Sequence, residues 1–316
     1  MSAIRFEHVN KQFANVGHTA VDDATFEVSE GSFVVLLGPS GCGKTTLLKM
    51  VNRLIEPTSG AIYLDGQDSQ TMDATTLRRQ IGYVIQQIGL FPHMTVAENV
   101  AVVPDLLKWP KEEIVARVDE MLALVDLPPV QYRDRYPAQL SGGQQQRVGV
   151  ARALAGDPKV ILMDEPFGAI DAITRTGLQD ALLHLQRRLH KTILFVTHDV
   201  EEALRLADRM VVMKDGRVHQ YDTPFNILKN PADDFVRELV GADDMVRQLG
   251  LIRVESAMQP LPPGFTRNGQ PTISQDDNLR QALSLLLGGD IPSLVVMSES
   301  RPVGVLTLQQ IQRYRE

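Results

Sequence analysis

The chain has 316 residues, of which 43% are hydrophobic and 22% charged, and its formal net charge is -7 at pH 7. This length predicts more than one domain, and the acidic balance argues against nucleic acid as a partner, because phosphate backbones demand clustered lysine and arginine. The apolar runs fall short of the about 18 residues that suggest a membrane helix, and residues 1–11 lack a signal-peptide core. A single cysteine cannot form an intrachain disulfide, so we expect a protein of the reducing cytoplasm.

The first 30 residues predict two strands. Apolar and polar residues alternate over 4–9 and again over 20–28, as in strands with one exposed face. Between them lies Phe13, whose flat ring could stack on an adenine base. Packing in the core or in a turn is the alternative, and the residue alone does not decide between the two.

A glycine-rich turn follows the apolar strand predicted over 33–37 and precedes a helical pattern over 47–54. It fits GxxxxGK[ST], in which small residues let backbone N–H groups surround a phosphate. In such a loop the Lys44 ammonium reaches the β- and γ-phosphates and the Thr45 hydroxyl ligates Mg²⁺. The residues expected to hold the nucleotide are Gly38, Ser40, Gly41, Cys42, Gly43, Lys44, Thr45 and Thr46. The turn therefore predicts an NTP site and leaves the type of NTPase open.

Two more strands are predicted over 60–65 and 81–85, and the second ends on Gln86. The carbonyl oxygen of this side chain could reach a metal ion or a water at a phosphate, and a surface glutamine is the alternative. Amphipathic patterns over 95–103 and 111–127 then predict helices, which interrupt the succession of strands with a helical insert.

Ser141 is placed to cap a helix predicted over 144–155. Two glycines beside a capping serine make a helix start that can bind an anion, separate from the phosphate loop. Taken alone, the motif could also be a capped helix without a ligand.

Two adjacent acids, Asp164 and Glu165, follow an apolar strand predicted over 160–163. Ligands gather at the carboxyl ends of strands in parallel α/β sheets, where Asp164 suits a water-mediated hold on Mg²⁺ and Glu165 suits polarising an attacking water. A charged turn is the structural alternative. A strand over 193–196 then leads to His198, which could hydrogen-bond a γ-phosphate or be structural.

The order of these motifs resembles the ATP-binding subunit of an ABC transporter over about residues 4–240. The resemblance implies an α/β fold, with a P-loop NTPase domain at 1–240 that contains a helical subdomain at about 87–155. It further implies that Phe13 stacks on adenine and that Gln86 touches Mg²⁺ while facing a membrane subunit. The Mg²⁺ ligands it implies are Thr45, Gln86 and Asp164.

The same resemblance implies an ATPase whose catalytic residues are Lys44, Glu165 and the switch histidine His198. Asp171 would lie in the loop that couples two sites, although Ala-Ile-Asp stands where Ala-Leu-Asp is commoner. The signature residues expected to cap ATP across a dimer are Ser141, Gly143 and Gln144.

Two anion-binding helix starts on one chain favour a head-to-tail homodimer, in which each chain covers the nucleotide that the other holds. Two ATP molecules would then be part of the interface, and their hydrolysis would loosen it. The resemblance implies an import-type subunit on the cytoplasmic side of the cell membrane, bound to an integral membrane permease and only indirectly served by a substrate-binding protein.

The C-terminal part predicts a smaller unit. A helical stretch over 233–249 leads through an expected linker, 241–255, to a β-α-β-β-α order over 256–316. In this small α+β unit, Ser256-Ala257-Met258 and Gly304-Val305-Leu306-Thr307 resemble a single CBS motif. CBS motifs form a regulatory domain that normally works in pairs, which favours pairing with the tail of a second chain. Gln310 stands where nucleotide-binding CBS members often have an acid, so a ligand of the tail, or a role in sensing ionic strength, stays open.

A CBS tail behind an importer ATPase resembles the glycine betaine, carnitine, choline and proline uptake family. We therefore expect an ATP-hydrolysing subunit that energises osmoprotectant import. An importer ATPase for another solute, such as a polyamine or amino acid, is one alternative. A soluble ABC ATPase of DNA repair or ribosomes is the other, although such proteins typically carry a coiled-coil insert or two cassettes in one chain.

Overall fold

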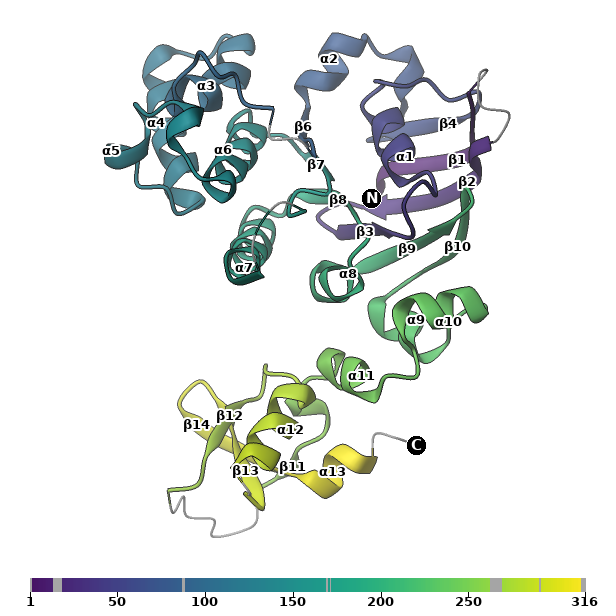
Figure 1. Cartoon of the computed structure of the whole chain (residues 1–316), viewed down its shortest axis with the longest axis vertical. Coiled ribbons are helices and arrows are strands. Elements are labelled where there is room, and N and C mark those ends of the chain that lie inside the picture. Colours follow the sequence, from purple (N-terminus) through teal and green to yellow (C-terminus); the bar gives the residue numbers. More distant parts are fainter. Residues whose placement is uncertain are drawn as a thin grey trace. The chain divides into compact units, whose positions relative to one another are not determined.

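The chain forms two compact units, Met1–Thr223 and Pro224–Glu316, in a computed structural model that describes residues 2–13, 19–86, 89–168, 170, 172–261, 269–289 and 291–313. The sequence placed the end of the first domain near residue 240. The division lies earlier because α9 (Pro224–Lys229) contacts both α10 (Asp234–Val240) and α11 (Met245–Leu251), which joins all three helices to the second unit (Figure 1).

The first unit contains an antiparallel sheet of order β2-β1-β4-β5. Buried residues alternate with more exposed ones along most of β1 and β2, which confirms the two strands predicted near the N-terminus. Phe6 on β1 faces Phe26 on β2, and their stacked rings have centroids 4.4 Å apart. The strands are β1 (Ser2–Gln12), β2 (Thr19–Ser29), β4 (Ser59–Leu64) and β5 (Gln67–Asp68).

A six-stranded sheet of order β10-β9-β3-β8-β7-β6 forms the other layer of this unit. Five of these strands are parallel and β10 is antiparallel. Since β3, β7 and β8 are buried on both faces, they read as unbroken apolar runs in the sequence. Parallel strands end at a common edge, so the loops after β3, β6, β7 and β8 meet there. The strands are β3 (Phe33–Leu37), β6 (Ile81–Val84), β7 (Val160–Asp164), β8 (Thr192–Thr197), β9 (Arg209–Lys214) and β10 (Arg217–Asp222).

Some helices lie beside this sheet, and others form a separate group next to its edge strand β6 (Figure 1). The group is the predicted helical insert, and the helix predicted over 111–127 ends at Leu124. Arg117 donates hydrogen bonds to the carbonyls of Leu154 and Ala155, which satisfies the end of α6. The insert contains α3 (Val96–Leu106), α4 (Lys111–Leu124), α5 (Pro129–Tyr132) and α6 (Gly142–Ala155). The helices beside the sheet are α1 (Lys44–Val51), α2 (Ala74–Arg79), α7 (Ala172–Leu189) and α8 (Val200–Leu206).

Gly82 lets β6 lie against the end of α6. A Cβ atom here would lie 2.6 Å from the Ala153 carbonyl oxygen and 3.0 Å from Pro158 Cγ. We therefore expect Gly82→Ala to lower the free energy of unfolding by about 1–3 kcal/mol through overpacking. Gly177→Ala is the matched control, since a Cβ on this exposed face of α7 meets nothing within 4 Å. It should instead stabilise by about 0.5–1 kcal/mol. Denaturant unfolding of both variants measures the difference, and equal effects would contradict the packing argument.

The second unit contains a sheet of order β11-β14-β13-β12, with the predicted β-α-β-β-α order over its last five elements. The helix predicted over 233–249 is interrupted at Gly241, which has φ 61° and caps α10. Residues 241–255, expected as a linker, include α11, and Leu249 and Val254 lie in the apolar core of this unit. Its other elements are β11 (Gln259–Pro260), β12 (Thr272–Ser274), α12 (Leu279–Gly288), β13 (Ser293–Ser298), β14 (Arg301–Thr307) and α13 (Leu308–Arg313).

Among the residues that the structure describes, no helix combines the length and the apolar character needed to cross a membrane.

Candidate active site

The loop between β3 and α1 is held in a tight curve by close backbone approaches. Gly41 and Gly43 have φ values of 83° and 104°, which side-chain-bearing residues rarely adopt. A Cβ at Gly38 would overlap the Met213 carbonyl oxygen, and one at Gly43 would overlap that of Ala20. Close backbone contacts therefore require glycine at positions 38 and 43, and a left-handed backbone favours it at positions 41 and 43.

Lys44 opens α1 and folds its ammonium back into this loop. Its Nζ donates to the carbonyl oxygens of Gly38 (2.7 Å) and Pro39 (2.9 Å) and lies 3.6 Å from Cys42 Sγ. The lysine side chain and the thiol are both buried. The positive charge thus sits in the concave side of the loop, where a phosphate oxygen would compete with the two carbonyls.

Thr45 and Asp164 bring the loop and the end of β7 together. Thr45 Oγ1 donates to Asp164 Oδ1 over 2.8 Å. Burial raises the pKa of the Asp164 carboxyl above its usual value, while the Thr45 hydrogen bond and the Lys49 ammonium oppose that shift. A hydroxyl and a carboxylate in contact are the oxygen donors that Mg²⁺ prefers, so this pair fits the predicted metal.

Glu165 is held by residues from both neighbouring strand ends. Its Oε2 accepts a hydrogen bond from Gln86 Nε2 over 3.1 Å, and its Oε1 lies 3.2 Å from His198 Nδ1. Its backbone, with φ 43°, donates to the Val196 carbonyl oxygen on β8. The order β8-β7-β6 therefore brings together three residues that lie far apart in the sequence. A carboxylate with both oxygens oriented can accept a proton at a defined place.

Ser141 and Gln144 form a reciprocal cap at the start of α6. The Gln144 N–H donates to Ser141 Oγ (3.3 Å), and the Ser141 N–H donates to Gln144 Oε1 (3.0 Å). This confirms the predicted N-cap. In the described part of the chain no hydrogen bond joins this cap to the site around Lys44 and Glu165, and Figure 1 shows α6 and α1 on different sides of β7. The two helix starts at which the sequence predicts anion binding are therefore separate on one chain.

Comparison with known proteins identifies the class of this site. The family model described as ABC transporter matches residues 21–168. The glycine betaine/carnitine/choline transport ATP-binding protein OpuCA of Bacillus subtilis is 48% identical, in a match that covers 99% of this chain and 80% of that protein. The chain belongs to the ABC transporter family. The predicted resemblance, the P-loop ABC ATPase fold and the class of enzyme, an ATP-hydrolysing subunit, are thereby confirmed.

Two further comparisons bear on the ABC ATPase part of the chain. The sulfate/thiosulfate import ATP-binding protein CysA of Gloeobacter violaceus is also 48% identical, but its match covers 76% of this chain and 68% of that protein. The dimeric post-hydrolysis structure of the ATP-binding cassette MJ0796, bound to ADP and Pi, has a TM-score of 0.64 and 35% identity. That match covers 70% of this chain and 98% of the cassette.

The contacts above do not include two predicted residues of the ABC ATPase, one because it is exposed and one because the structure does not describe it. Phe13 is 37% exposed, so it does not lie in the core, and the Lys11 ammonium lies 5.2 Å from the centre of its ring. Asp171, predicted to couple two sites, lies outside the described residues.

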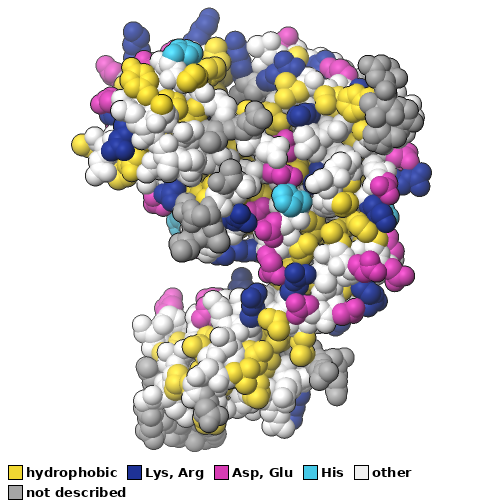
Figure 2. All heavy atoms as spheres, viewed as in Figure 1, with side chains coloured by type: hydrophobic (Ala, Val, Ile, Leu, Met, Phe, Trp, Pro, Cys, Tyr) yellow, Lys and Arg dark blue, Asp and Glu magenta, His cyan; other side chains and the backbone are white. Residues whose placement is uncertain are grey.

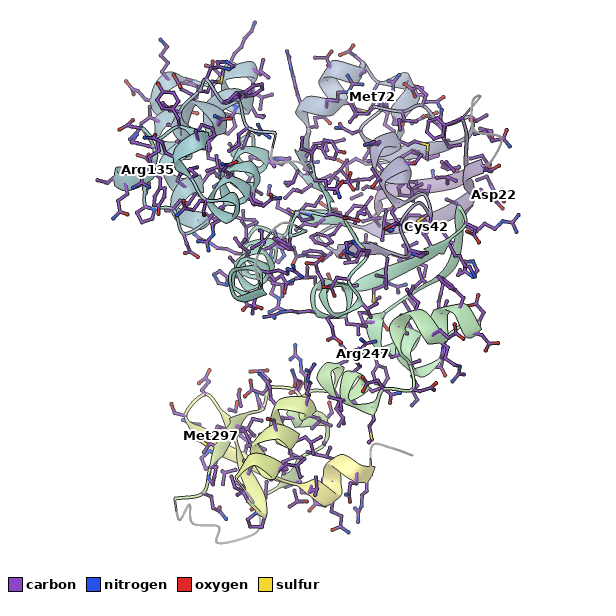
Figure 3. All side chains as sticks on the ribbon, viewed as in Figure 1. Asp22, Cys42, Met72, Arg135, Arg247 and Met297 are labelled. Carbon is purple, nitrogen blue, oxygen red and sulfur yellow. The ribbon has the colours of Figure 1, made fainter. Side chains whose placement is uncertain are left out.

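A hollow beside the phosphate loop was not predicted from the sequence. It has a volume of about 560 Å³ and lies between Gly41, the start of β2 and the turn of the β9–β10 hairpin. The Gly216 N–H donates to the Cys42 carbonyl oxygen, and Arg217 Nε donates to Asp22 Oδ2 over 2.7 Å. Figure 3 labels Asp22 and Cys42 in this region. The dipeptide Asp215-Gly216 predicts a turn, and hence a hairpin, from the sequence, but the contact of this hairpin with the loop depends on strand order.

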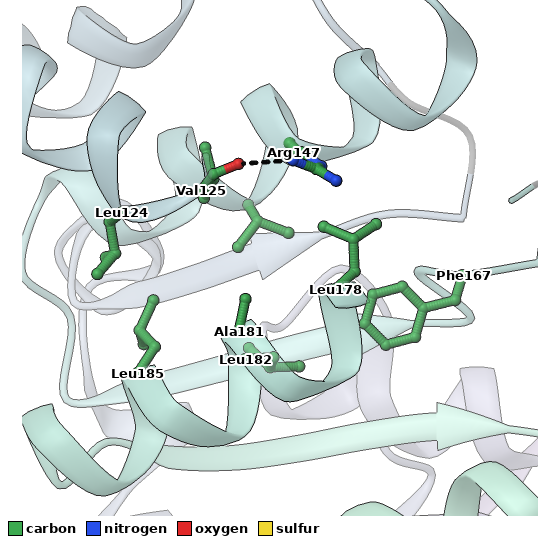
Figure 4. Close-up of a pocket in the computed structure, with 9 residues that line it drawn as sticks. Leu124, Val125, Arg147, Phe167, Leu178, Ala181, Leu182 and Leu185 are labelled. Carbon is green, nitrogen blue, oxygen red and sulfur yellow. Dashed lines mark hydrogen bonds between the residues drawn. The ribbon is translucent and has the colours of Figure 1, made fainter. Parts of the chain in front are cut away.

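A second, much smaller cavity of about 20 Å³ lies where the helical subdomain packs on α7 (Figure 4). Leu178, Leu182 and Leu185 of α7 line it, and Arg147 Nη1 donates to the Val125 carbonyl oxygen at its rim. It has room for about one water, so it belongs to the packing of the subdomain and not to a nucleotide site.

Proposed function

We propose that the chain is the ATP-hydrolysing subunit of an importer for an osmoprotectant of the glycine betaine, choline or carnitine type. The observation that supports this cargo is the share of the chain that each relative's match covers. The sulfate relative is as similar as the osmoprotectant relative, yet its match leaves about a quarter of the chain uncovered, whereas the osmoprotectant match covers 99%. The ATPase part is therefore shared by importers of different cargo, and the remainder sets the osmoprotectant relative apart.

The site supports ATP as the nucleotide and Mg²⁺ as its metal. The phosphate loop would surround the β- and γ-phosphates with its N–H groups, and the Lys44 ammonium would bind a phosphate oxygen. Thr45, Asp164 and Gln86 would hold the metal, which supplies positive charge to the phosphate oxygens when it is bound. The exposed ring of Phe13 would stack on the adenine.

Glu165 would act as the base in hydrolysis. Its carboxylate polarises a water molecule and accepts a proton from it as the oxygen of that water attacks the γ-phosphorus. Gln86 and His198 orient the two carboxylate oxygens, and His198, with a side chain that is 57% exposed, is free to hydrogen-bond the γ-phosphate as well. The proton acceptor, Glu165, and the two residues that orient it are therefore in position before the substrate binds.

The separate cap at Ser141 supports a head-to-tail homodimer. Ser141, Gly143 and Gln144 would cover the ATP held by a second copy, and Asp171 would couple the two sites. Such a dimer would bind an integral membrane permease from the cytoplasmic side, and through it serve a substrate-binding protein.

The second unit would act as a regulatory CBS-like domain that pairs with its copy in the dimer. Its Gln310 side chain is buried, and its Oε1 accepts a hydrogen bond from the Thr307 N–H over 2.6 Å. The side chain therefore caps α13, in the position where an acid could hold a ribose. This use of Gln310 argues against ribose binding by that side chain.

The test is ATP turnover of this subunit in vesicles that contain its permease and binding protein. We expect glycine betaine to stimulate turnover several-fold and sulfate to leave it at the basal rate. The Lys44→Ala variant in the same vesicles gives the background. Stimulation by another solute alone would overturn the cargo and leave the ATPase assignment standing.

A further inference from the structure

Arg175, on the first turns of α7, joins two segments at the edge of the site. Its Nη2 donates to the Ile170 carbonyl oxygen over 3.0 Å, and its Nη1 donates to Asp199 Oδ2 over 3.4 Å. The guanidinium Nε is buried and has no hydrogen-bond partner in the described part of the chain. Because the guanidinium is planar and its donors have a fixed spacing, these two contacts tie the positions of Ile170 and Asp199 to each other.

Asp199 fixes the backbone next to His198. Its Oδ1 accepts a hydrogen bond from the Glu202 N–H over 3.2 Å, which makes it the N-cap of α8. Its own N–H donates to Thr197 Oγ1 over 3.0 Å. These hydrogen bonds fix the residues on both sides of His198, and the imidazole itself contacts Glu165.

A second contact, one turn further along α7, holds the same segment. Gln179 Nε2 donates to Glu202 Oε1 over 3.0 Å, and both side chains are buried. Burial raises the pKa of Glu202, and hydrogen bonds with Thr197 and Gln179 oppose that rise. Residues four apart lie on one face of a helix, so Arg175 and Gln179 form a two-point attachment of α7 to the start of α8.

We propose that Arg175 is a positioning residue that links the loop at Ile170 to His198 and, through it, to the carboxylate of Glu165. This inference rests on the proposed ATPase function. Ile170 directly precedes Asp171, the residue predicted to couple the two ATP sites. A shift of this loop therefore moves the Ile170 carbonyl oxygen to which Arg175 donates. The guanidinium transmits that change to Asp199 and so to the orientation of the imidazole that contacts Glu165.

The test uses the full chain with Arg175→Gln, which removes the charge facing Asp199. We expect the kcat for ATP to fall about 10- to 100-fold through misplacement of the catalytic groups. The KM for ATP should change by less than about threefold, because the phosphate loop is untouched. Arg188→Gln, at an exposed position on the last turns of the same helix, should keep both constants. Arg175→Lys should recover part of the loss, since a cation again faces Asp199.

The imidazole signal of His198 in a nuclear magnetic resonance spectrum, identified by its loss in His198→Gln, gives a readout that needs no turnover. It should move in Arg175→Gln and stay in place in Arg188→Gln. A folded Arg175→Gln chain with wild-type kcat and an unmoved signal would overturn the link. If that variant does not fold, Asp199→Asn, which keeps a good cap, decides in its place by the same two readouts. A wild-type chain without ATP turnover would overturn the proposed function instead, and the His198 signal would still test the link.

Discussion

Replacing Lys44 with alanine is expected to reduce ATP turnover by about 100-fold or more, because the phosphate loop loses a preorganised positive charge. In the structure the ammonium is already buried among loop carbonyls, so it needs little rearrangement to meet a phosphate. Its removal also leaves the carbonyl oxygens of Gly38 and Pro39 without that donor. Nucleotide affinity should therefore fall together with turnover, which a fluorescent ATP analogue and a phosphate-release assay measure separately.

Lys111→Ala is the matched control, because this lysine is exposed on the first turn of α4 and the substitution removes the same charge. It should bind and hydrolyse ATP as the wild type does. Normal turnover in Lys44→Ala would mean that the loop between β3 and α1 is not the nucleotide site, whatever the control shows.

Much of the fold could be predicted because its signals are local. The apolar runs that end at Leu37, Met163 and Val196 are strands buried on both faces, and such strands stand out in any sequence. The cap at Ser141 and the turn at Asp215-Gly216 are likewise specified by a few neighbouring residues. The residues of the site lie directly after these strands. Because parallel strands end at the same edge of a sheet, the sequence predicts that these residues lie at one edge, whatever the order of the strands.

The remaining features depend on how distant segments pack. Gln86 and His198 meet the carboxylate of Glu165 only because β6 and β8 lie on either side of β7, and no local pattern specifies that order. The bracing of Cys42 by Gly216 depends in the same way on β9 lying beside β3. The break at Gly241 was missed because the apolar period continues across it, although a glycine in the left-handed region ends the helix.

Glu165→Gln is expected to lower the kcat for ATP about 100- to 10,000-fold, the range lost when a general base is removed. The amide has the shape of the carboxylate and can still accept from Gln86, but it cannot take a proton from water. The phosphate loop, Thr45 and Asp164 keep their contacts, so ATP should remain bound with Mg²⁺. If ATP is part of a head-to-tail interface, a chain that binds but does not cleave it should accumulate as a dimer.

Light scattering during size-exclusion chromatography, with ATP and Mg²⁺ in the column buffer, measures that accumulation. Glu112→Gln, an exposed change in the first turn of α4, should turn over ATP normally and show no added dimer. A Glu165→Gln chain that binds ATP yet stays monomeric would contradict the interface and leave the base intact. A variant that hydrolyses ATP at the wild-type rate would contradict the role of Glu165, and with it the reason for its contacts with Gln86 and His198. The two measurements therefore separate the chemistry of one chain from the assembly of two.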